Sequence, residues 1–250
     1  MTIWQSLFLG VLQGLTEFLP VSSSGHLILA GQLFDIPNDL AFDVFLHLGT
    51  LASVCLIMRK SISALFTKDH SRTLLMLILA SIPTFAIALL VKLFIEEELL
   101  NKLLPIGFAL TIVLLFLTHF LAKERISLKK RVLPQIICGV VQGVAVLPGL
   151  SRSGSTIATL SLFGASKEEA TEFSFLLSIP VIAASGIAEG YTAFKSGFDT
   201  AFLNVLAGIF ASFLVGCFAI ALVKKLAVQN RLVYFAVYLF IPLLISLILL

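Results

Sequence analysis

A group of polar residues interrupts an apolar stretch in the second half of the chain. The sequence "PGLSRSGST" (148–156) brings Arg152 together with four hydroxyl side chains and two glycines. A guanidinium is a planar fork of donors that matches a pair of phosphate oxygens. The glycines let backbone amides approach a ligand, and a helix that starts near Ser155 would point its N-terminus at an anion. The sequence therefore predicts a phosphate receptor, whose binding residues are Ser22 from the first half of the chain and Ser151, Arg152, Ser153, Gly154 and Thr156.

A second polar group lies in the sequence "QGLTEFLPVSSSGH" (13–26). Gln13 and Glu17 are four residues apart, so they share one face of a helix. A carboxylate inside a membrane is costly and indicates function, and Glu17 could hold Mg²⁺ or Ca²⁺ shared with phosphate oxygens. Ser23 and His26 are close enough in a tight turn to act as nucleophile and base, or His26 could itself be the nucleophile or general acid. The catalytic candidates are Glu17, Ser23, His26 and Arg152, and the metal candidates are Glu17 and Gln13.

These residues also have purely structural interpretations. Ser151 could cap a helix while Arg152 extends its guanidinium to the membrane surface, and His26 could be a packing residue. Four further polar residues either surround the site or pair with one another where helices meet; they are Asp43, His47, Glu172 and Ser174.

The composition shows where these polar groups must lie. Of the 250 residues, 59% are apolar and only 12% are charged, and the mean hydropathy is +1.08. A soluble domain of this size needs more charge to cover its surface, so we expect an all-α polytopic membrane protein. Six stretches are long and apolar enough to be transmembrane helices, namely 41–58, 73–95, 103–122, 171–190, 200–223 and 232–250.

The distribution of basic residues predicts the orientation of these spans. The loops 59–72, 123–131 and 224–231, together with Lys167, hold 13 of the 17 Lys and Arg residues. The positive-inside rule places these loops in the cytoplasm and both termini outside. No Lys or Arg precedes Arg59, so a cleaved signal peptide is not expected.

Two apolar stretches, 2–33 and 132–164, do not fit this alternation of charge. Each is broken midway by Pro, Gly and Ser residues and begins and ends on the same predicted face. We therefore interpret each as a re-entrant helix–loop–helix segment, a form tolerated in a membrane where it is buried in protein or lines a wet cavity. Two such segments that enter from opposite faces would meet near the middle of the bilayer.

An internal repeat supports this arrangement. The sequence "GVLQGLTEFLPVSSSG" (10–25) aligns without gaps on "GVVQGVAVLPGLSRSG" (139–154), with 7 of 16 positions identical. We expect a single integral membrane domain over 1–250, with repeat 1 at about 1–122 and repeat 2 at about 132–250. Each repeat holds one re-entrant segment and three spans, so the second repeat is inverted, and the site is expected at their interface.

The motifs "QGLTEFLPVSSSGH" and "PGLSRSGST" resemble the two signature motifs of the undecaprenyl-diphosphate phosphatase family (the bacitracin-resistance type), and "FDVFLHLGT" (42–50) and "EFSFLLSIP" (172–180) resemble its neighbouring segments. The resemblance covers essentially the whole chain. It implies hydrolysis of a C55 isoprenyl diphosphate to the monophosphate and phosphate, which recycles the lipid carrier of cell-wall synthesis. It also implies a divalent-cation cofactor and six spans with two re-entrant pairs.

Carried over by position, the family's functional residues match Glu17, Ser23, His26, Ser151, Arg152 and Thr156. The family has Glu or Gln where this chain has Gln13, and a neutral amide weakens the case for that position as a charged metal ligand. The partners implied are a polyprenyl diphosphate lipid and the bilayer, with no nucleic acid, and a homo-oligomer stays open. The expected location is the bacterial inner (plasma) membrane, with the active site open to the outer face.

A transporter or flippase of polyprenyl phosphate is the main alternative, because inverted repeats with broken helices are common among transporters. An Arg and a Glu at the midplane would serve either activity, but only a phosphatase would release inorganic phosphate. A structural scaffold is a third alternative, which a buried Glu17 and Arg152 disfavour.

Overall fold

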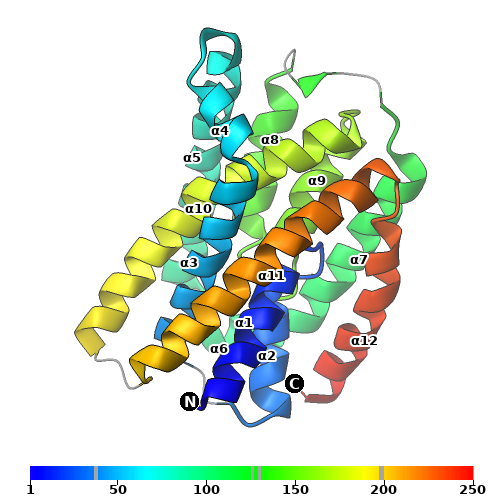
Figure 1. Cartoon of the computed structure of the whole chain (residues 1–250). Coiled ribbons are helices and arrows are strands. Elements are labelled where there is room, and N and C mark those ends of the chain that lie inside the picture. Colours follow the sequence, from blue (N-terminus) through cyan, green and yellow to red (C-terminus); the bar gives the residue numbers. More distant parts are fainter. Residues whose placement is uncertain (37–38, 125–126, 129–130, 197–199, 250) are drawn as a thin grey trace.

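The computed structural model describes residues 1–36, 39–124, 127–128, 131–196 and 200–249, and every regular element in these ranges is helical (Figure 1). The helices are α1 (Ile3–Phe18), α2 (Ser23–Leu33), α3 (Leu40–Ile57), α4 (Arg59–Leu65), η1 (Lys68–His70), α5 (Ser71–Phe94), α6 (Glu97–Lys102), α7 (Leu104–Leu121), α8 (Leu133–Val144), α9 (Arg152–Leu162), α10 (Lys167–Ser196), α11 (Phe202–Val228) and α12 (Val233–Leu249).

Each of the six predicted spans coincides with a helix, namely α3, α5, α7, α10, α11 and α12. Four stretches are long and apolar enough to cross a membrane: Lys68–Phe94, Leu104–Leu121, Lys167–Ile187 and Phe202–Val228. A fifth candidate is the pair of α3 and α4, which is bent by 73°. The sixth, α12, has 17 residues and belongs to the shorter apolar helices, although its length of about 25 Å approaches the thickness of a hydrocarbon core.

Two helices extend beyond the predicted spans because charged residues continue them. The predicted span 200–223 stops before Lys224, whereas α11 runs to Val228; Lys is a good helix former, and its long side chain reaches the membrane surface. Similarly, α10 begins at Lys167 rather than at 171, with Glu168 and Glu169 in its first turn, where the helix dipole favours carboxylates.

The helix pairs α1–α2 and α8–α9 each contain a sharp break. Leu19 precedes Pro20 and is extended, with ψ of 143°, because a proline disfavours helical backbone in the residue before it. In the second pair, Gly149 has a φ of +81°, which glycine adopts without strain. Ser22 and Ser151 then cap α2 and α9, since each side chain accepts a hydrogen bond from a backbone amide three residues later.

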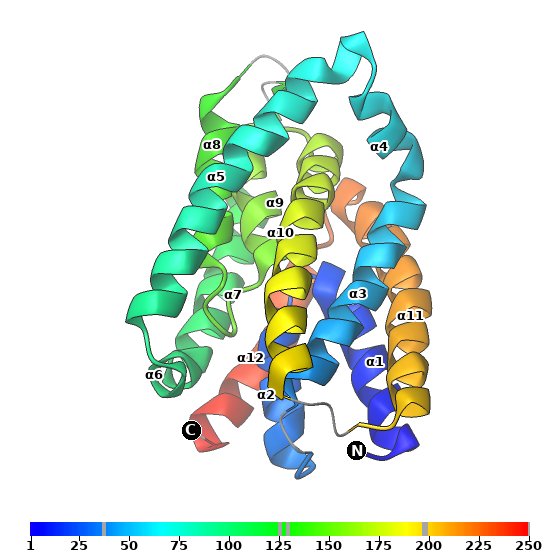
Figure 2. The same cartoon turned by 90° about the vertical axis from the view of Figure 1, so that its left-hand side faces the viewer.

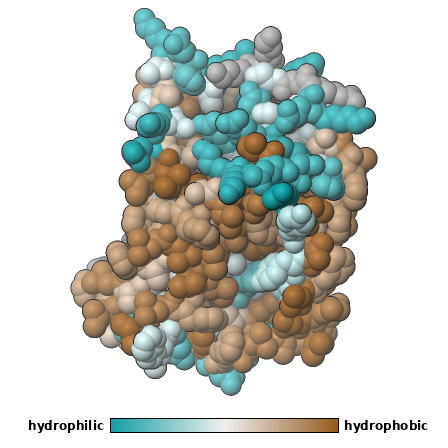
Figure 3. All heavy atoms as spheres, turned by 45° about the vertical axis from the view of Figure 1, so that its right-hand side comes forward, coloured by the Kyte–Doolittle hydropathy of each residue, from teal (hydrophilic) through white to brown (hydrophobic). Residues whose placement is uncertain are grey.

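The helix ends that carry basic residues and the two chain termini lie at opposite ends of the molecule. Figure 1 shows α4, the beginning of α8 and the C-terminal end of α11 at one end, and both chain termini at the other. Hydrophilic side chains gather at the first end, whereas hydrophobic ones cover much of the remaining face in Figure 3. Three of the predicted cytoplasmic basic residues, Arg125, Lys129 and Lys130, lie outside the described residues.

Small residues let α1 and α8 pack closely on long helices. A Cβ at Gly10 would lie 2.5 Å from the carbonyl oxygen of Gly208 in α11, and one at Gly14 would lie 2.7 Å from that of Ser212. Gly139 and Gly143 of α8 face α5 in the same manner (Figure 2). Such close approaches are typical of helices that associate within a membrane, and they fix the two broken pairs inside the bundle.

Candidate active site

The two breaks bring one carboxylate and one guanidinium together. Glu17 lies in the last turn of α1, and Arg152 is the first residue of α9. Arg152 Nη2 pairs with Glu17 Oε1, and both side chains are largely buried. The helix is predicted to start near Ser155, but α9 begins three residues earlier, at Arg152, because Ser151 provides its N-cap. Since a buried charge needs a partner, the pair explains how Arg152 stays inside the protein.

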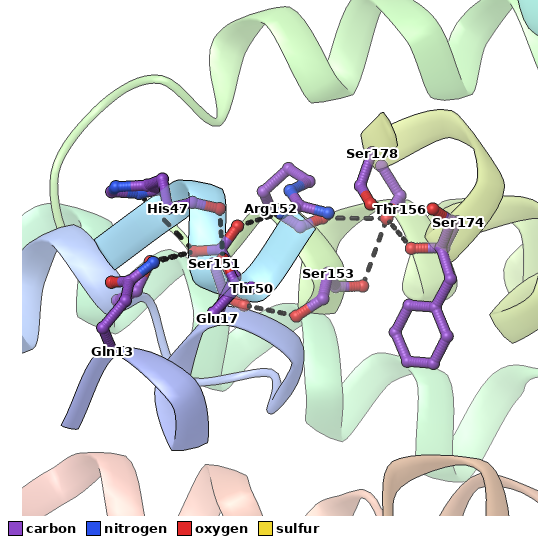
Figure 4. A network of polar contacts seen from close by, with 12 residues as sticks. Gln13, Glu17, His47, Thr50, Ser151, Arg152, Ser153, Thr156, Ser174 and Ser178 are labelled. Carbon is purple, nitrogen blue, oxygen red and sulfur yellow. Dashed lines mark hydrogen bonds and ion pairs between the residues drawn. The ribbon is translucent and has the colours of Figure 1, made fainter. Parts of the chain in front are cut away.

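The second oxygen of Glu17 collects three polar groups. Ser23 Oγ, at the start of α2, donates to Glu17 Oε2 at 2.6 Å, and Gln13 Nε2 donates to it at 3.1 Å. His47 Nε2, from α3, lies 3.7 Å from the same oxygen. Figure 4 shows Gln13, His47 and Arg152 converging on Glu17. The predicted grouping of Gln13, Glu17, Ser23 and Arg152 is thus present in the structure.

The backbone of the second break is held by α7. Thr111 Oγ1 donates to the carbonyl oxygen of Gly149 at 3.1 Å and accepts from the amide of Ser151 at 2.9 Å. Ser151 Oγ in turn accepts from the amide of Gly154 at 3.0 Å. These bonds fix the N-terminus of α9 beside the Glu17–Arg152 pair, where its remaining amides can receive an anion.

Two hydroxyls predicted to bind phosphate are already used within the protein. Ser153 Oγ donates to the carbonyl oxygen of Leu19 at 3.0 Å and so joins the two breaks. Thr156 Oγ1 lies 2.8 Å from the carbonyl oxygen of Arg152 and 2.6 Å from Ser174 Oγ of α10 (Figure 4). Both residues support the site in this structure, and neither lines its cavity.

His26 is not paired with Ser23. Its Nδ1 lies 2.7 Å from the carbonyl oxygen of Ser22, and its Nε2 lies 2.9 Å from the hydroxyl of Tyr238 in α12. The ring stacks on Tyr238 and packs edge-on against Phe108. The predicted contact between Ser23 and His26 is therefore absent from this structure. The imidazole bonds to the Ser22 carbonyl and points toward α12, and the Ser23 hydroxyl donates to Glu17.

The four residues whose role stayed open have different surroundings. His47 lines the cavity, with Nδ1 2.8 Å from the carbonyl oxygen of Asp43, and Ser174 supports Thr156. Glu172 accepts a hydrogen bond from Ser61, away from the ion pair. His47 and Ser174 therefore belong to the surroundings of the site, whereas Glu172 joins α10 to α4.

A cavity of about 270 Å³ opens between the two breaks and helices α3 and α10. Its polar lining residues, here called the polar wall, include Glu17, Ser22, Ser23, Ser151 and Arg152. Its apolar lining residues, here called the apolar wall, are Val44, Val146, Leu150, Val181 and Ile182, of which Val146 and Leu150 lie in the same break as Ser151. The apolar residues could not be predicted, because in the sequence they resemble any other membrane-buried position. Gln142 also lines the cavity and is not among the predicted site residues, although the internal repeat aligns it with Gln13.

The oxygens near Glu17 fit a divalent cation that shares its ligands with a substrate. In the part of the chain that the structure describes, no group of three or more His, Cys, Asp or Glu side chains could hold a metal. Gln13 Oε1, however, is buried and has no hydrogen-bond partner in that part of the chain. Mg²⁺ is commonly held by one or two carboxylates with waters and phosphate oxygens, so Glu17 and Gln13 suit a cation that arrives with a diphosphate.

Known proteins resemble this chain over almost its whole length. A family model described as "Bacitracin resistance protein BacA" matches residues 6–244. A protein named undecaprenyl-diphosphatase from Treponema denticola is 38% identical, with 97% of this chain and 95% of the relative covered. Two relatives have the same name. The one from Carboxydothermus hydrogenoformans is 38% identical, with 96% of this chain and 95% of the relative covered, and the one from Halothermothrix orenii is 39% identical, with 95% of this chain and 94% of the relative covered. The chain is therefore a multi-pass helical membrane protein that belongs to the bacitracin resistance protein BacA family.

Proposed function

We propose that this protein hydrolyses undecaprenyl diphosphate to undecaprenyl monophosphate and inorganic phosphate, which recycles the lipid carrier of cell-wall synthesis. The observation that carries the proposal is the convergence of Ser23, Glu17 and Arg152 at the polar wall of one cavity. A potential nucleophile, a proton acceptor and a phosphate-binding cation are the parts that phosphoryl transfer requires. The name of the relatives described above supports the same substrate.

The terminal phosphate would bind between Arg152 and the N-terminus of α9. Arg152 Nη2 contacts Glu17, whereas Nη1 is buried without a hydrogen-bond partner among the described residues. This nitrogen and the amides of the first turn of α9 provide donors for phosphate oxygens. Because these donors are fixed before substrate arrives, they would stabilise charge that develops in the transition state.

Ser23 is the best-placed nucleophile. Its hydroxyl donates to Glu17 Oε2 at 2.6 Å, so the proton already lies on the path to a carboxylate. Attack by Ser23 Oγ on the terminal phosphorus would release the lipid monophosphate, and water would then free the phosphate from the serine. His47 lies beside the same carboxylate oxygen, whereas His26 holds α2 against α12.

A divalent cation fits this scheme as a partner of the diphosphate. Glu17 and Gln13 would hold the cation, and when bound it would neutralise phosphate charge as a Lewis acid. Gln13 Nε2 donates to Glu17, and Gln13 Oε1 has no hydrogen-bond partner among the described residues. Gln13 itself does not line the cavity, so Glu17 would be the ligand that faces the diphosphate. Removal of the cation with EDTA is therefore expected to abolish turnover and to leave the fold intact.

The size of the cavity favours a lipid whose headgroup alone enters. A volume of about 270 Å³ lies just below the usual range for small-molecule pockets and cannot enclose a C55 chain. The polyprenyl tail would therefore stay in the bilayer while the diphosphate reaches the polar wall. The apolar wall is suited to the first part of the tail.

The proposed topology has six crossings, two re-entrant segments and an inverted repeat. It is supported by helix boundaries that recur at a shift of 129: α2 and α9 match at both ends, and α7 and α12 match at their first residue. Figure 1 supports entry from opposite ends, since α1 begins near the termini and α8 begins near α4. The basic end would be cytoplasmic, with the site in the bacterial inner membrane and open to the outer face.

A cysteine at Lys225, in a variant without the three native cysteines, tests this orientation. A reagent that does not cross membranes should leave Lys225→Cys unlabelled in intact cells and label it after permeabilisation. Labelling of intact cells would contradict the proposed orientation.

Phosphate release by the purified protein tests the proposed activity. The protein in detergent should release phosphate from a polyprenyl diphosphate, and EDTA should stop the release. The alternative, a transporter of polyprenyl phosphate, predicts none under the same conditions. A Ser23→Ala variant provides the control for contaminating phosphatases.

A further inference from the structure

Gln142 of α8 has a polar atom that the site described above does not use. The residue is only 1% exposed, yet it lines the cavity that contains Glu17 and Arg152. Its Oε1 is buried and lacks a hydrogen-bond partner in the described ranges of the chain. A buried acceptor without a partner costs free energy, so a group that enters the cavity is the natural partner of this oxygen.

Thr84 of α5 fixes the orientation of the Gln142 amide. Thr84 Oγ1 lies 2.7 Å from the carbonyl oxygen of Gly139 and 3.0 Å from that of Ala80. Both are acceptors, so the single proton of the hydroxyl is donated to one of them. The Thr84 oxygen therefore accepts from Gln142 Nε2, which lies 3.3 Å away. The acceptor Oε1 is consequently the free end of the amide.

The chemistry of the cavity limits what this oxygen can bind. An ionised diphosphate presents acceptor oxygens, which an amide oxygen repels, whereas Arg152 provides donors for them. The partner of Oε1 is therefore either a cation or a group that brings a hydrogen atom. The proposed scheme already assigns the cation to Glu17 and Gln13, and hydrolysis consumes a molecule that has two hydrogen atoms. We infer that Gln142 Oε1 accepts a hydrogen bond from the water that releases phosphate and so orients it toward phosphorus. The inference rests on the proposed phosphatase function.

The reaction balances with one water. A bond forms between the water oxygen and the terminal phosphorus, and the bond from that phosphorus to the bridging oxygen breaks. The bridging oxygen leaves with the electron pair as part of the lipid monophosphate, and both water protons end on the released phosphate. When Ser23 attacks first, the water enters in the second displacement, and the serine oxygen leaves with the electron pair and regains its proton.

Gln135 offers a matched control on the same helix. Like Gln142 it is buried, its Nε2 donates to a neighbour (the carbonyl oxygen of Leu128, at 2.6 Å), and its Oε1 has no partner within the described residues. Unlike Gln142 it does not line the cavity. A general effect of losing a buried amide from α8 would therefore be seen at both positions, whereas a role in turnover would be seen only at Gln142.

The experiment compares the wild-type protein with Gln142→Leu, Gln142→Glu and Gln135→Leu. Phosphate release gives kcat, and a lipid diphosphonate with a methylene bridge, which cannot be hydrolysed, gives binding affinity. We expect Gln142→Leu to lower kcat about a hundredfold, the scale of losing one preorganised group, with unchanged affinity for the diphosphonate. Gln142→Glu keeps an acceptor oxygen but loses the donor to Thr84 and adds a negative charge, so it should retain more kcat than Gln142→Leu while it binds the diphosphonate more weakly than the wild-type protein does. Gln135→Leu should keep the wild-type kcat.

Several results would overturn the inference. Full activity of Gln142→Leu would show that no reacting water depends on Oε1, and equal losses in both leucine variants would indicate helix packing. Weak binding of the diphosphonate to Gln142→Leu would show that the amide contacts phosphate rather than water. If Gln142→Leu required a higher cation concentration than the wild-type protein for half-maximal activity, Oε1 would be assigned to the cation.

Two further outcomes are also decisive. If the wild-type protein releases no phosphate while it binds the diphosphonate, the proposed function itself is wrong. If Gln142→Leu cannot be purified, Gln142→Met takes its place, since methionine has a similar volume and no amide oxygen: a loss of kcat with unchanged diphosphonate affinity supports the inference, and a wild-type kcat overturns it.

Discussion

The first broken helix pair, α1–α2, and the second, α8–α9, are related by a shift of 129 residues but present different chemistry to the cavity. Ser23 and Arg152 are equivalent first residues of α2 and α9, and one provides a hydroxyl where the other provides a guanidinium. Glu17 corresponds to Val146, and His26 corresponds to Ser155. The identical positions include the capping serines Ser22 and Ser151, and also Gln13 and Gln142.

The helix ends explain part of this difference. α1 continues for three residues beyond the position equivalent to the end of α8, and Glu17 lies in that additional stretch. The first pair also contains a strained residue, since Ser22 has a φ of 70°, whereas the second pair places its positive φ on Gly149. Strain in a residue other than glycine is typical of functional sites. In the proposed scheme, the first pair would provide the nucleophile, and the second would provide the guanidinium that binds phosphate and the amide that orients water.

Replacement of the reacting hydroxyl should produce the largest effect. Ser23→Ala removes the group that contacts Glu17, and we expect kcat to fall about a thousandfold or more, as in enzymes that lose their nucleophile. Single-turnover phosphate release from a purified variant measures this. A loss of only about tenfold would instead assign Ser23 to positioning and would transfer the attack to water.

Neutralisation of Glu17 should have the next largest effect. Glu17→Gln keeps the volume but removes the partner of Arg152 and the cation ligand, so we expect kcat to fall several hundredfold, on the scale of losing a proton acceptor. The variant should still insert into membranes and be extracted with detergent. Turnover near the wild-type rate with undiminished sensitivity to EDTA would refute its role at the cation.

A conservative change at Arg152 tests the binding role of the second pair. Lysine keeps the charge but loses the planar fork, so Arg152→Lys should lower kcat about a hundredfold with a smaller change in KM. Arg152→Ala should lower it further, because the bound diphosphate would then face Glu17 without compensation. A fully active, well-folded lysine variant would show that the guanidinium serves only as the ionic partner of Glu17 and that its fork does not bind phosphate.

Removal of the hydroxyl that holds His26 should have the smallest effect. Tyr238→Phe breaks the bond to Nε2, and we expect it to cost about 1 kcal/mol of stability, the usual value of one hydrogen bond. Because His26 does not line the cavity, kcat should change less than about threefold. Thermal unfolding in detergent and phosphate release measure the two effects. A loss of kcat much greater than this would place His26 in the reaction.

The sequence by itself determined the helical class, the positions of the long apolar helices and the two breaks. Apolar stretches of sufficient length, with Pro and Gly between them, leave few alternatives in a membrane, since every backbone amide must be satisfied within its own helix. The identical residues at a shift of 129 also predicted that the segments of Glu17 and Arg152 meet, which their ion pair confirms. These features depend on the residues within each segment and on the membrane that surrounds them.

Only the tertiary structure decided which polar groups face one another. Ser23 and His26 are three residues apart, yet one reaches Glu17 and the other reaches Tyr238, 212 positions along the chain. Gln142 and Gln135 both lie on α8, and although the repeat aligns Gln142 with Gln13, only the packing of α8 shows that Gln142 lines the cavity and Gln135 does not. The direction of a side chain depends on which neighbours the helices bring to it, and in a bundle those neighbours come from distant parts of the sequence.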